Sequence, residues 1–237
     1  MGGRVLITRP EPGAARTAER LRTLGFVPVR LPLTEICPTA AELPLGHIFD
    51  AVAVSSANAI RHARPSLLRT LSGLPVFAVG RRTAEAAAKT GLANPTTGPG
   101  DGQRLATLMT DRLPRGARVA YLCGRVRAHG FEETLRAAGI EATPVETYDT
   151  IVLDYTDAEL ETALGGEAFD AVLLYSRIAA NAFSLLTDRS VMPLLLARTA
   201  FVCMSERVAG PVIPAWGTRV RIAGGLNEEA MLARLAG

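Results

Sequence analysis

Six short polar turns carry the side chains of this sequence that are best suited to chemistry. Each turn follows an apolar run of strand length and contains Gly, Ser or Thr, and five of the six contain an arginine. Guanidinium groups, hydroxyls and free backbone N–H groups all bind carboxylates and phosphates. The pattern therefore predicts a site for a small molecule with several negative charges. The residues expected to contact it are Thr8, Arg9, Ser55, Ser56, Asn58, Gly80, Thr83, Gly124, Arg125, Ser176, Arg177 and Ser205.

A purely structural role for these residues is the alternative. Ser and Thr before a helix are common N-caps, each worth about 1 kcal/mol without any ligand. An arginine in the first helical turn, by contrast, faces the positive end of the helix dipole and is mildly unfavourable unless an anion is near. Of the 26 basic residues only Lys89 is a lysine, which fits either a codon bias towards arginine or a use for bidentate anion binding.

Motifs of several other function classes are missing from the sequence. No GxxxxGK[ST] loop and no strand followed by GxGxxG occurs, so nucleotide, nicotinamide and flavin sites are not indicated. The three cysteines have no zinc-like spacing, and we expect reduced thiols, no metal and no cofactor. None of the three histidines follows a strand end, which disfavours a Ser–His–Asp site: His47, His62 and His129. Nucleic acid is disfavoured because the arginines form no basic run and aromatic residues make up only 5%.

The elements that must position the polar turns form a regular alternation. Apolar runs alternate with amphipathic helical segments, as in parallel, doubly wound sheets covered by helices on both faces. Gly25 stands where a C-cap glycine ends the first helix, and residues 156–159 form a capping box that opens a later one. Strands are predicted at 4–8, 26–31, 51–54, 76–79, 118–122, 140–145, 171–174, 200–204 and 220–222.

The two halves of the chain repeat one another. The sequence Phe-Asp-Ala-Val occurs at 49–52 and again at 169–172, and each copy is followed by apolar residues and a serine. Arg4-Val5 corresponds to Arg118-Val119, and the remaining elements keep the same order. A length of 237 residues suits two domains. We therefore expect a tandem duplication that forms two similar α/β domains with a cleft between them.

Nothing in the sequence indicates a membrane or an export signal. No apolar run approaches the roughly 20 residues needed to span a bilayer. The first ten residues are too soon interrupted by Arg9 and Pro10 to be a secretory signal, and they are typical of a buried strand and its turn. We expect a cytoplasmic protein.

Several motifs, in order and at suitable spacing, resemble the uroporphyrinogen-III synthase family. They are Thr-Arg-Pro at 8–10, Leu-Gly at 24–25, the Ser-Ser-Ala-Asn-Ala that follows Asp50, Ala-Val-Gly-x-x-Thr-Ala at 78–84, Leu-Cys-Gly-Arg at 122–125, Ala-Gly-Ile at 138–140, Tyr-Asp-Thr at 148–150 and a second Asp-to-Ser segment at 170–176. The resemblance spans essentially the whole chain. It implies two flavodoxin-like domains, of which the first is discontinuous (1–32 plus 153–237) and the second spans 38–147. They would be joined by crossings near 33–37 and 148–152 that form a two-stranded antiparallel linker.

The resemblance also implies a reaction. The family closes the linear tetrapyrrole hydroxymethylbilane, a polycarboxylate, with inversion of the terminal ring and loss of water, in porphyrin biosynthesis. It implies a cofactor-free lyase, which we expect to be a monomer, with Tyr148 as the side chain involved in catalysis. One departure is the turn at 205–209, where Val208 replaces the threonine that the family commonly has. The alternative function is therefore a non-catalytic regulatory module of the same fold that binds a tetrapyrrole or another anion.

Overall fold

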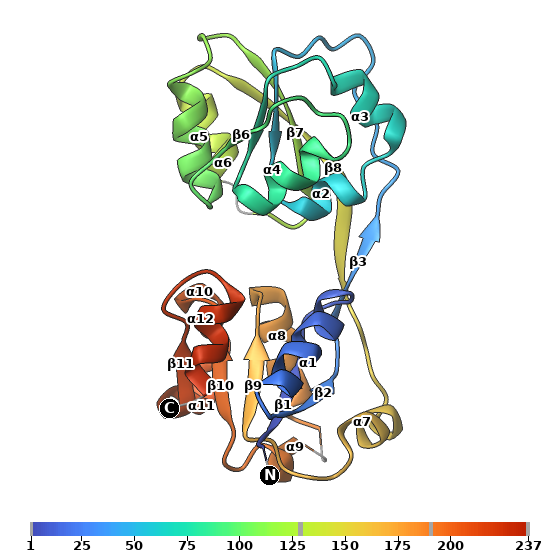
Figure 1. The fold of residues 1–237 in the computed structure, drawn as a ribbon, viewed down its shortest axis with the longest axis vertical. Helices are drawn as coiled ribbons and strands as arrows, with labels where there is room; N and C mark the ends of the chain where they lie inside the picture. The colour runs from blue at the N-terminus through green and yellow to red at the C-terminus, as the bar shows by residue number, and fades with distance from the viewer. Residues whose placement is uncertain (1, 128–129, 190–191, 236–237) are drawn as a thin grey trace. The chain divides into compact units, whose positions relative to one another are not determined.

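The computed structural model describes residues 2–127, 130–189 and 192–235, and the chain divides into two compact units. Unit 1 comprises residues 1–35 and 151–237, and unit 2 comprises residues 36–150. Figure 1 shows each unit as a sheet with helices on both faces. The chain passes between the units through two strands, β3 (Thr34–Pro38) and β8 (Glu141–Val152).

Unit 1 contains a five-stranded parallel sheet with the order β11-β10-β9-β1-β2. In chain order this is 2-1-3-4-5, the flavodoxin-like arrangement. Its strands are β1 (Arg4–Ile7), β2 (Val27–Arg30), β9 (Ala171–Leu174), β10 (Ala200–Cys203) and β11 (Val220–Ile222). Its helices are α1 (Gly13–Thr23), α7 (Asp157–Leu164), α8 (Arg177–Leu186), α9 (Met192–Leu195), α10 (Glu206–Ala209), α11 (Ile213–Trp216) and α12 (Glu228–Leu232), with 3-10 turns at Gly217–Arg219 and Ala233–Leu235.

Unit 2 contains a six-stranded sheet with the order β3-β8-β7-β4-β5-β6. The strands from β8 to β6 are parallel. The backbone N–H of Thr39 donates to the Thr147 carbonyl, and the N–H of Leu153 donates to the Leu33 carbonyl. Later residues of the β3 segment therefore pair with earlier residues of the β8 segment, so the two strands are antiparallel. The other strands are β4 (Ala51–Val54), β5 (Val76–Ala78), β6 (Thr96–Thr97) and β7 (Arg118–Gly124). The helices are α2 (Ala57–Arg61), α3 (Pro65–Leu71), α4 (Arg81–Ala88), α5 (Gly102–Thr110) and α6 (Gly130–Ala137).

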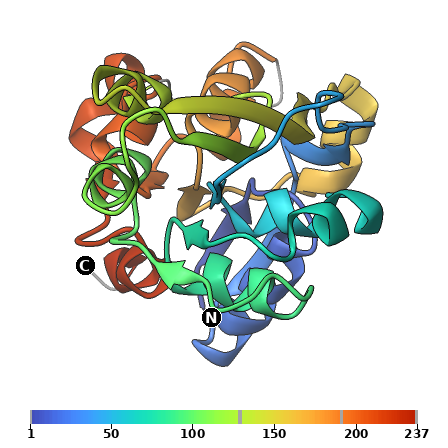
Figure 2. The same ribbon diagram turned by 90° about the horizontal axis from the view of Figure 1, so that it is seen from above.

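The central strands of each sheet are buried on both faces, because helices cover both of the sides to which successive strand residues point. In β4, Val52 and Val54 pack with the helices α2 to α4, whereas Ala51 and Ala53 pack with α5 and α6. Figures 1 and 2 show these two groups of helices on opposite faces of the sheet. In unit 1, α1 and α12 cover one face, and the helices from α7 to α10 cover the other. This explains why the central strands are apolar almost end to end.

The sequence repeat has a direct counterpart in the hydrogen bonds of the two units. In unit 1 the carboxylate of Asp170 accepts a hydrogen bond from the backbone N–H of Arg4 at 2.7 Å. In unit 2 the carboxylate of Asp50 accepts one from the backbone N–H of Arg118, also at 2.7 Å. In both units the aspartate precedes a central strand and binds the first residue of the neighbouring parallel strand. The repeated Phe-Asp motif is thus a device that sets the register between two strands.

The structure confirms the predicted fold class, the Thr156 capping box and the glycine end of the first helix, where Gly25 has a φ of +83°. All nine predicted strands are present, but β8 extends to Val152, seven residues beyond its predicted end. Residues 146–150 are mostly polar, so a search for apolar runs does not include them, although the family resemblance placed a linker strand at 148–152. β6 was also missed, because it is only two residues long and polar. No described helix is long and apolar enough to cross a membrane.

Candidate functional site

The central edge of unit 2 brings several of the predicted residues together. β4 and β7 are neighbours at the centre of the sheet. The chain leaves β4 towards β5 on one side and leaves β7 towards β8 on the other, which makes this the topological switch point. Ser55 and Ser56 follow β4, Gly124 ends β7, and Tyr148 lies beside Gly124 in β8. Because the strands are parallel, their carboxyl ends meet at one edge. In open sheets this edge is the usual place for a ligand.

Tyr148 is held at this edge by a hydrogen bond to Ser56. The phenolic oxygen lies 3.1 Å from Oγ of Ser56, which also accepts a bond from the Ala59 N–H as the N-cap of α2. Burial raises the pKa of the Tyr148 phenol, and the bond to Ser56 opposes that rise only in part. The phenol is therefore neutral at neutral pH and can donate a proton. The ring of His62 lies 6.2 Å away, centroid to centroid, and burial lowers the pKa of its imidazole.

Gly124 provides the space in which the Tyr148 ring lies. A Cβ atom at position 124 would be 2.6 Å from Cζ of Tyr148 and 2.9 Å from its phenolic oxygen. No side chain fits at such a distance unless the ring moves. Gly124 stays a predicted ligand contact, and the structure shows that it also allows the close approach of the tyrosine.

Arg125 and Arg127 follow β7, and acidic side chains hold both of them. Arg125 pairs with Asp149 at 2.8 Å and with Glu146 at 3.3 Å. Arg127 pairs with Glu132 at 2.9 Å and with Glu146 at 2.8 Å. An anionic ligand at Arg125 would have to compete with these carboxylates. These partners had no signal in the sequence, because they come from α6 and from the part of β8 that lacks an apolar run.

The remaining predicted residues of unit 2 lie at the ends of β4 and β5. Oγ of Ser55 donates to the Leu122 carbonyl at 3.2 Å, and Oδ1 of Asn58 accepts from Arg61 at 3.0 Å. Gly80 is the N-cap of α4, and Thr83 lies buried in the first turn of that helix. These turns lie at the same edge as Tyr148. Among the described residues, however, no hydrogen bond connects Gly80 or Thr83 to Tyr148.

In unit 1, the residues predicted at the ends of β1 and β9 are largely engaged by the protein itself. Thr8 is fully buried and donates to the Leu173 carbonyl at 2.7 Å. Arg9 binds Glu228 at 3.0 Å and stacks over the Tyr175 ring at 4.3 Å. Ser176 caps α8 by accepting the Ala179 N–H at 3.2 Å.

Glu228 is the centre of this second cluster, and no pattern in the sequence had indicated it. Its carboxylate accepts hydrogen bonds from Thr17, from Tyr175 at 3.1 Å and from Arg20 at 2.7 Å, in addition to Arg9. Burial alone would raise the pKa of the Glu228 carboxyl, but these bonds and the charge on Arg9 outweigh it and lower the pKa. The cluster ties α12 to α1 and to the edge of the sheet. Arg9 thus stabilises the C-terminal helix in addition to any contact with a ligand.

The last two predicted residues of unit 1 are Arg177 and Ser205. Arg177 begins α8 and is exposed, with no ion pair or side-chain hydrogen bond to any described residue. Ser205 precedes α10 without a capping bond from its side chain. Arg177 therefore meets the requirement for binding an external anion better than Arg9 or Arg125 does. His129 lies outside the described residues.

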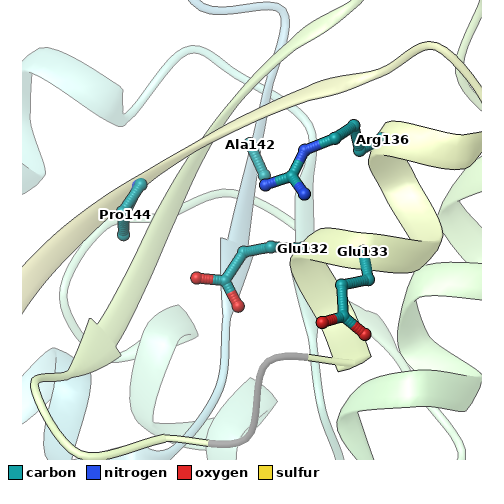
Figure 3. Close-up of a pocket in the computed structure, with 5 residues that line it drawn as sticks. All are labelled: Glu132, Glu133, Arg136, Ala142 and Pro144. Carbon is teal, nitrogen blue, oxygen red and sulfur yellow. The ribbon is translucent and has the colours of Figure 1, made fainter.

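A separate surface pocket of about 310 Å³ lies between α6 and β8 (Figure 3). Three charged side chains of α6 line it, Glu132, Glu133 and Arg136, together with Ala142 and Pro144 of β8. Two carboxylates beside one guanidinium disfavour a polyanion, and none of the predicted ligand contacts lines the pocket. The described residues also include no group of three or more His, Cys, Asp or Glu side chains placed to hold a metal ion.

A family model described as uroporphyrinogen-III synthase HemD matches residues 15–233. The chain belongs to the uroporphyrinogen-III synthase family. This confirms the family predicted from the motifs and, with it, the assignment to the synthases of porphyrin biosynthesis.

Curated relatives agree with this assignment. The uroporphyrinogen-III synthase of Escherichia coli K12 is 33% identical over 172 residues, which cover 65% of this chain and 68% of that protein. The uroporphyrinogen-III synthase of Salmonella typhimurium is 28% identical over 246 residues, covering 98% and 99%. A porphyrin biosynthesis protein HemD of Ruminiclostridium josui is 26% identical over 162 residues, covering 63% of this chain and 32% of that longer protein.

Solved structures of the family share the fold. The Helicobacter pylori uroporphyrinogen-III synthetase matches with a TM-score of 0.66 at 18% identity, covering 100% of this chain and 99% of that one. A mutant uroporphyrinogen III synthase of Thermus thermophilus matches with a TM-score of 0.59 at 19% identity, covering 99% and 98%. At these identities the likeness supports the architecture, with two α/β units that each contain a parallel sheet.

Proposed function

We propose that the chain cyclises hydroxymethylbilane to uroporphyrinogen III, with inversion of the terminal ring and loss of water. The observation that carries the proposal is the pair of Tyr148 and Ser56 at the switch-point edge of unit 2, in a member of this family. The pair combines a neutral phenol with a hydrogen-bonded hydroxyl. It offers a proton donor and no strong nucleophile.

The proposed chemistry requires little more than that. The lone pair of the terminal pyrrole nitrogen expels the substrate hydroxyl, and the C–O bond breaks while Tyr148 donates a proton to the departing oxygen, which leaves as water. The proton lost from that nitrogen balances the one donated. The far pyrrole then attacks the resulting azafulvene through its substituted α-carbon and forms a spiro intermediate. The older bond from that α-carbon to the methylene of the neighbouring ring breaks, and this methylene bonds instead to the free α-carbon of the far pyrrole, which is thereby reversed. The free α-carbon loses its proton, and the nitrogen that gave up a proton in the first step regains one. Holding both terminal rings in the reacting geometry can contribute several kcal/mol to lowering the barrier.

The substrate carboxylates would be bound by the polar turns that follow the strands. The proposed contacts are those predicted from the sequence, and among their arginines Arg177 is the one without a described protein partner. Ser56 and Ser176 offer their hydroxyls and the N–H groups of the helices they cap. We also propose that the two compact units are the two domains expected from the sequence and that the protein acts as a cytoplasmic monomer.

The test of the activity is a product-resolved assay with freshly generated hydroxymethylbilane. The purified protein is expected to yield the type III isomer at a rate proportional to enzyme concentration. Accumulation of only the type I isomer, the product of unassisted closure, at every enzyme concentration would refute the proposal. Light scattering on the same sample tests the monomer.

A regulatory module that binds the ligand without turnover is the second candidate, because the 205–209 turn lacks a threonine. The surroundings of Val208 reduce the weight of the missing threonine as an argument against catalysis. Val208 is 6% exposed and packs in the core, and its counterpart Thr83 is 4% exposed. The Thr83 hydroxyl makes no hydrogen bond to a described residue, so valine at the matching position removes no bond within the protein. Tight tetrapyrrole binding without type III product would favour the module.

A further inference from the structure

The strand that carries Tyr148 contains a β-bulge immediately before it. In the ladder between β7 and β8, Cys123 is opposite Glu146, and the next residue, Gly124, is opposite Tyr148. Thr147 is therefore the extra residue of β8 and has no counterpart in β7. Bulges of this kind redirect the side chains that follow them. Without the bulge, Gly124 would face Thr147, and Tyr148 would lie one position beyond the end of β7.

Thr147 is fixed at the bulge by its own hydroxyl. The residue is fully buried, and its Oγ1 donates to the carbonyl of Ala59 in α2 at 2.8 Å. In a continued helix that carbonyl would bond to the N–H of Ala63, which instead bonds to Ile60. Thr147 thus satisfies a helix-end carbonyl that has lost its helical partner. A hydroxyl is required for this bond, and a side chain of the same shape without one cannot form it.

A continuous set of hydrogen bonds connects Thr147 with the Tyr148 hydroxyl through the first turn of α2. Thr147 holds the carbonyl of Ala59, and the N–H of the same Ala59 donates to Oγ of Ser56 at 3.2 Å. Oγ of Ser56 lies 3.1 Å from the phenolic oxygen of Tyr148, which directly follows Thr147 in the chain. The bulge and the first turn of α2 are thereby fixed relative to each other at two points.

We propose that Thr147 is a positioning residue that sets the place of the Tyr148 hydroxyl by holding the bulge against α2. The inference rests on the proposed function only in that Tyr148 acts on the substrate. Thr147 itself is buried beneath this edge and does not reach a ligand.

The test compares Thr147→Val with a matched control. Thr147→Val keeps the shape and removes the hydroxyl, and kcat is expected to fall about tenfold with little change in KM, as for loss of a transition-state interaction. Thr147→Ser is expected to restore kcat to within about twofold. The control is Thr199→Val in unit 1, where a fully buried threonine likewise donates to a backbone carbonyl, that of Phe169, at 2.7 Å. It should lower the melting temperature similarly and leave kcat unchanged.

A double variant and a spectrum separate positioning from general destabilisation. In the Tyr148→Phe background, Thr147→Val should have no further effect on kcat, because the group that it positions is gone. With fluorotyrosine incorporated, the Tyr148 resonance should shift in Thr147→Val but not in Thr199→Val. If the valine variant does not fold, Thr147→Cys, a weaker donor of similar size, should show the same pattern.

The outcomes distinguish this inference from the proposed function. A Thr147→Val protein with unchanged kcat and an unmoved Tyr148 resonance overturns the inference, even where Tyr148→Phe is slow. A wild-type protein that makes no type III isomer overturns the proposed function. The fluorine spectrum still decides whether Thr147 positions the tyrosine in that case.

Discussion

The phenolic oxygen of Tyr148 lies 3.1 Å from Oγ of Ser56, a residue 92 positions earlier in the chain. The same Oγ caps α2, so one serine connects the end of β4 with the side chain that follows the bulge in β8. Its counterpart in the sequence repeat, Ser176, caps α8 at the same 3.2 Å but has no tyrosine bond among the described contacts. The duplicated serine turns thus have different surroundings in the two units.

Comparison of Ser56→Ala with Ser176→Ala tests this difference. Both variants lose a helix cap and should each lose about 1 kcal/mol of stability, as judged from melts. Only Ser56→Ala also loses the partner of Tyr148, so its kcat should fall about two- to tenfold, the range expected for one neutral hydrogen bond. Loss of Ser176, a proposed substrate contact, should change KM rather than kcat. Equal kcat values in the two variants would show that Ser56 acts only as a cap.

A methyl group at position 124 is expected to displace the Tyr148 ring. In Gly124→Ala the new Cβ would lie 2.6 Å from Cζ of the tyrosine, so the ring must move. We expect a kcat about tenfold lower and a disturbed Tyr148 resonance. Gly73→Ala is the control, because nothing lies within 4 Å of its Cβ. A Gly124→Ala enzyme as fast as Gly73→Ala would mean that the ring position does not matter.

Arg177 is expected to contribute to substrate binding through its charge, which pairs with no residue that the structure describes. Arg177→Ala should raise KM about two- to fivefold at low salt, as for an exposed ion pair, without changing the melting temperature. Salt should shrink the difference, because it screens exposed charges. Arg69→Ala, at the exposed C-terminal end of α3, makes the same charge change at a residue that is not a predicted contact. An equal KM rise in both variants would indicate a general effect of net charge.

The sequence predicted the sheets well because burial on both faces leaves a strong signal. Strands such as β4 and β9 are fully buried at every residue, and their bounds were predicted without error. The repeated Phe-Asp motif likewise predicted two similar units, and the Asp50 and Asp170 bonds give the physical reason for its repetition.

The side-chain contacts of the candidate site could not be predicted in the same way. Arg9 and Arg125 lie in the predicted turns, but their partners Glu228 and Asp149 are distant in the chain or belong to another strand. The bulge at Thr147 has no sequence signature, because a one-residue shift in register depends on the opposing strand and on α2. Local patterns identify turns, and only the tertiary structure shows which side chains meet there.

Glu228 should make the stability of unit 1 depend on pH. Its folded pKa is lowered, so its contribution is fully present above the unfolded value of about 4.3 and is lost as pH falls through the folded pKa. Glu228→Gln should therefore be less stable at pH 7 by about 1.5–3 kcal/mol, the range for hydrogen bonds to a charged group. Below about pH 4 the difference from wild type should shrink.

Thermal melts between about pH 3 and 7, the range in which glutamate side chains titrate, measure the stability difference between Glu228→Gln and wild type. Glu167→Gln is the control, because that carboxylate is 78% exposed and its ion pair with Arg4 is long, at 3.6 Å. It should change stability by less than about 0.5 kcal/mol at any pH. A constant difference between Glu228→Gln and wild type across the range would contradict the assignment.

Removal of the Tyr148 hydroxyl tests the mechanism itself. Tyr148→Phe should slow turnover about 10- to 100-fold, or roughly 1.4–2.7 kcal/mol of barrier, because the leaving oxygen loses its proton donor. The product should remain mainly type III, since the binding turns still orient both terminal rings. Tyr155→Phe is the control, because it removes a hydroxyl bonded to the Pro32 carbonyl in unit 1. A Tyr148→Phe enzyme with the turnover rate of wild type would show that the tyrosine serves only in packing. One that releases only type I would show that the hydroxyl governs ring inversion, and orientation alone would no longer explain the product.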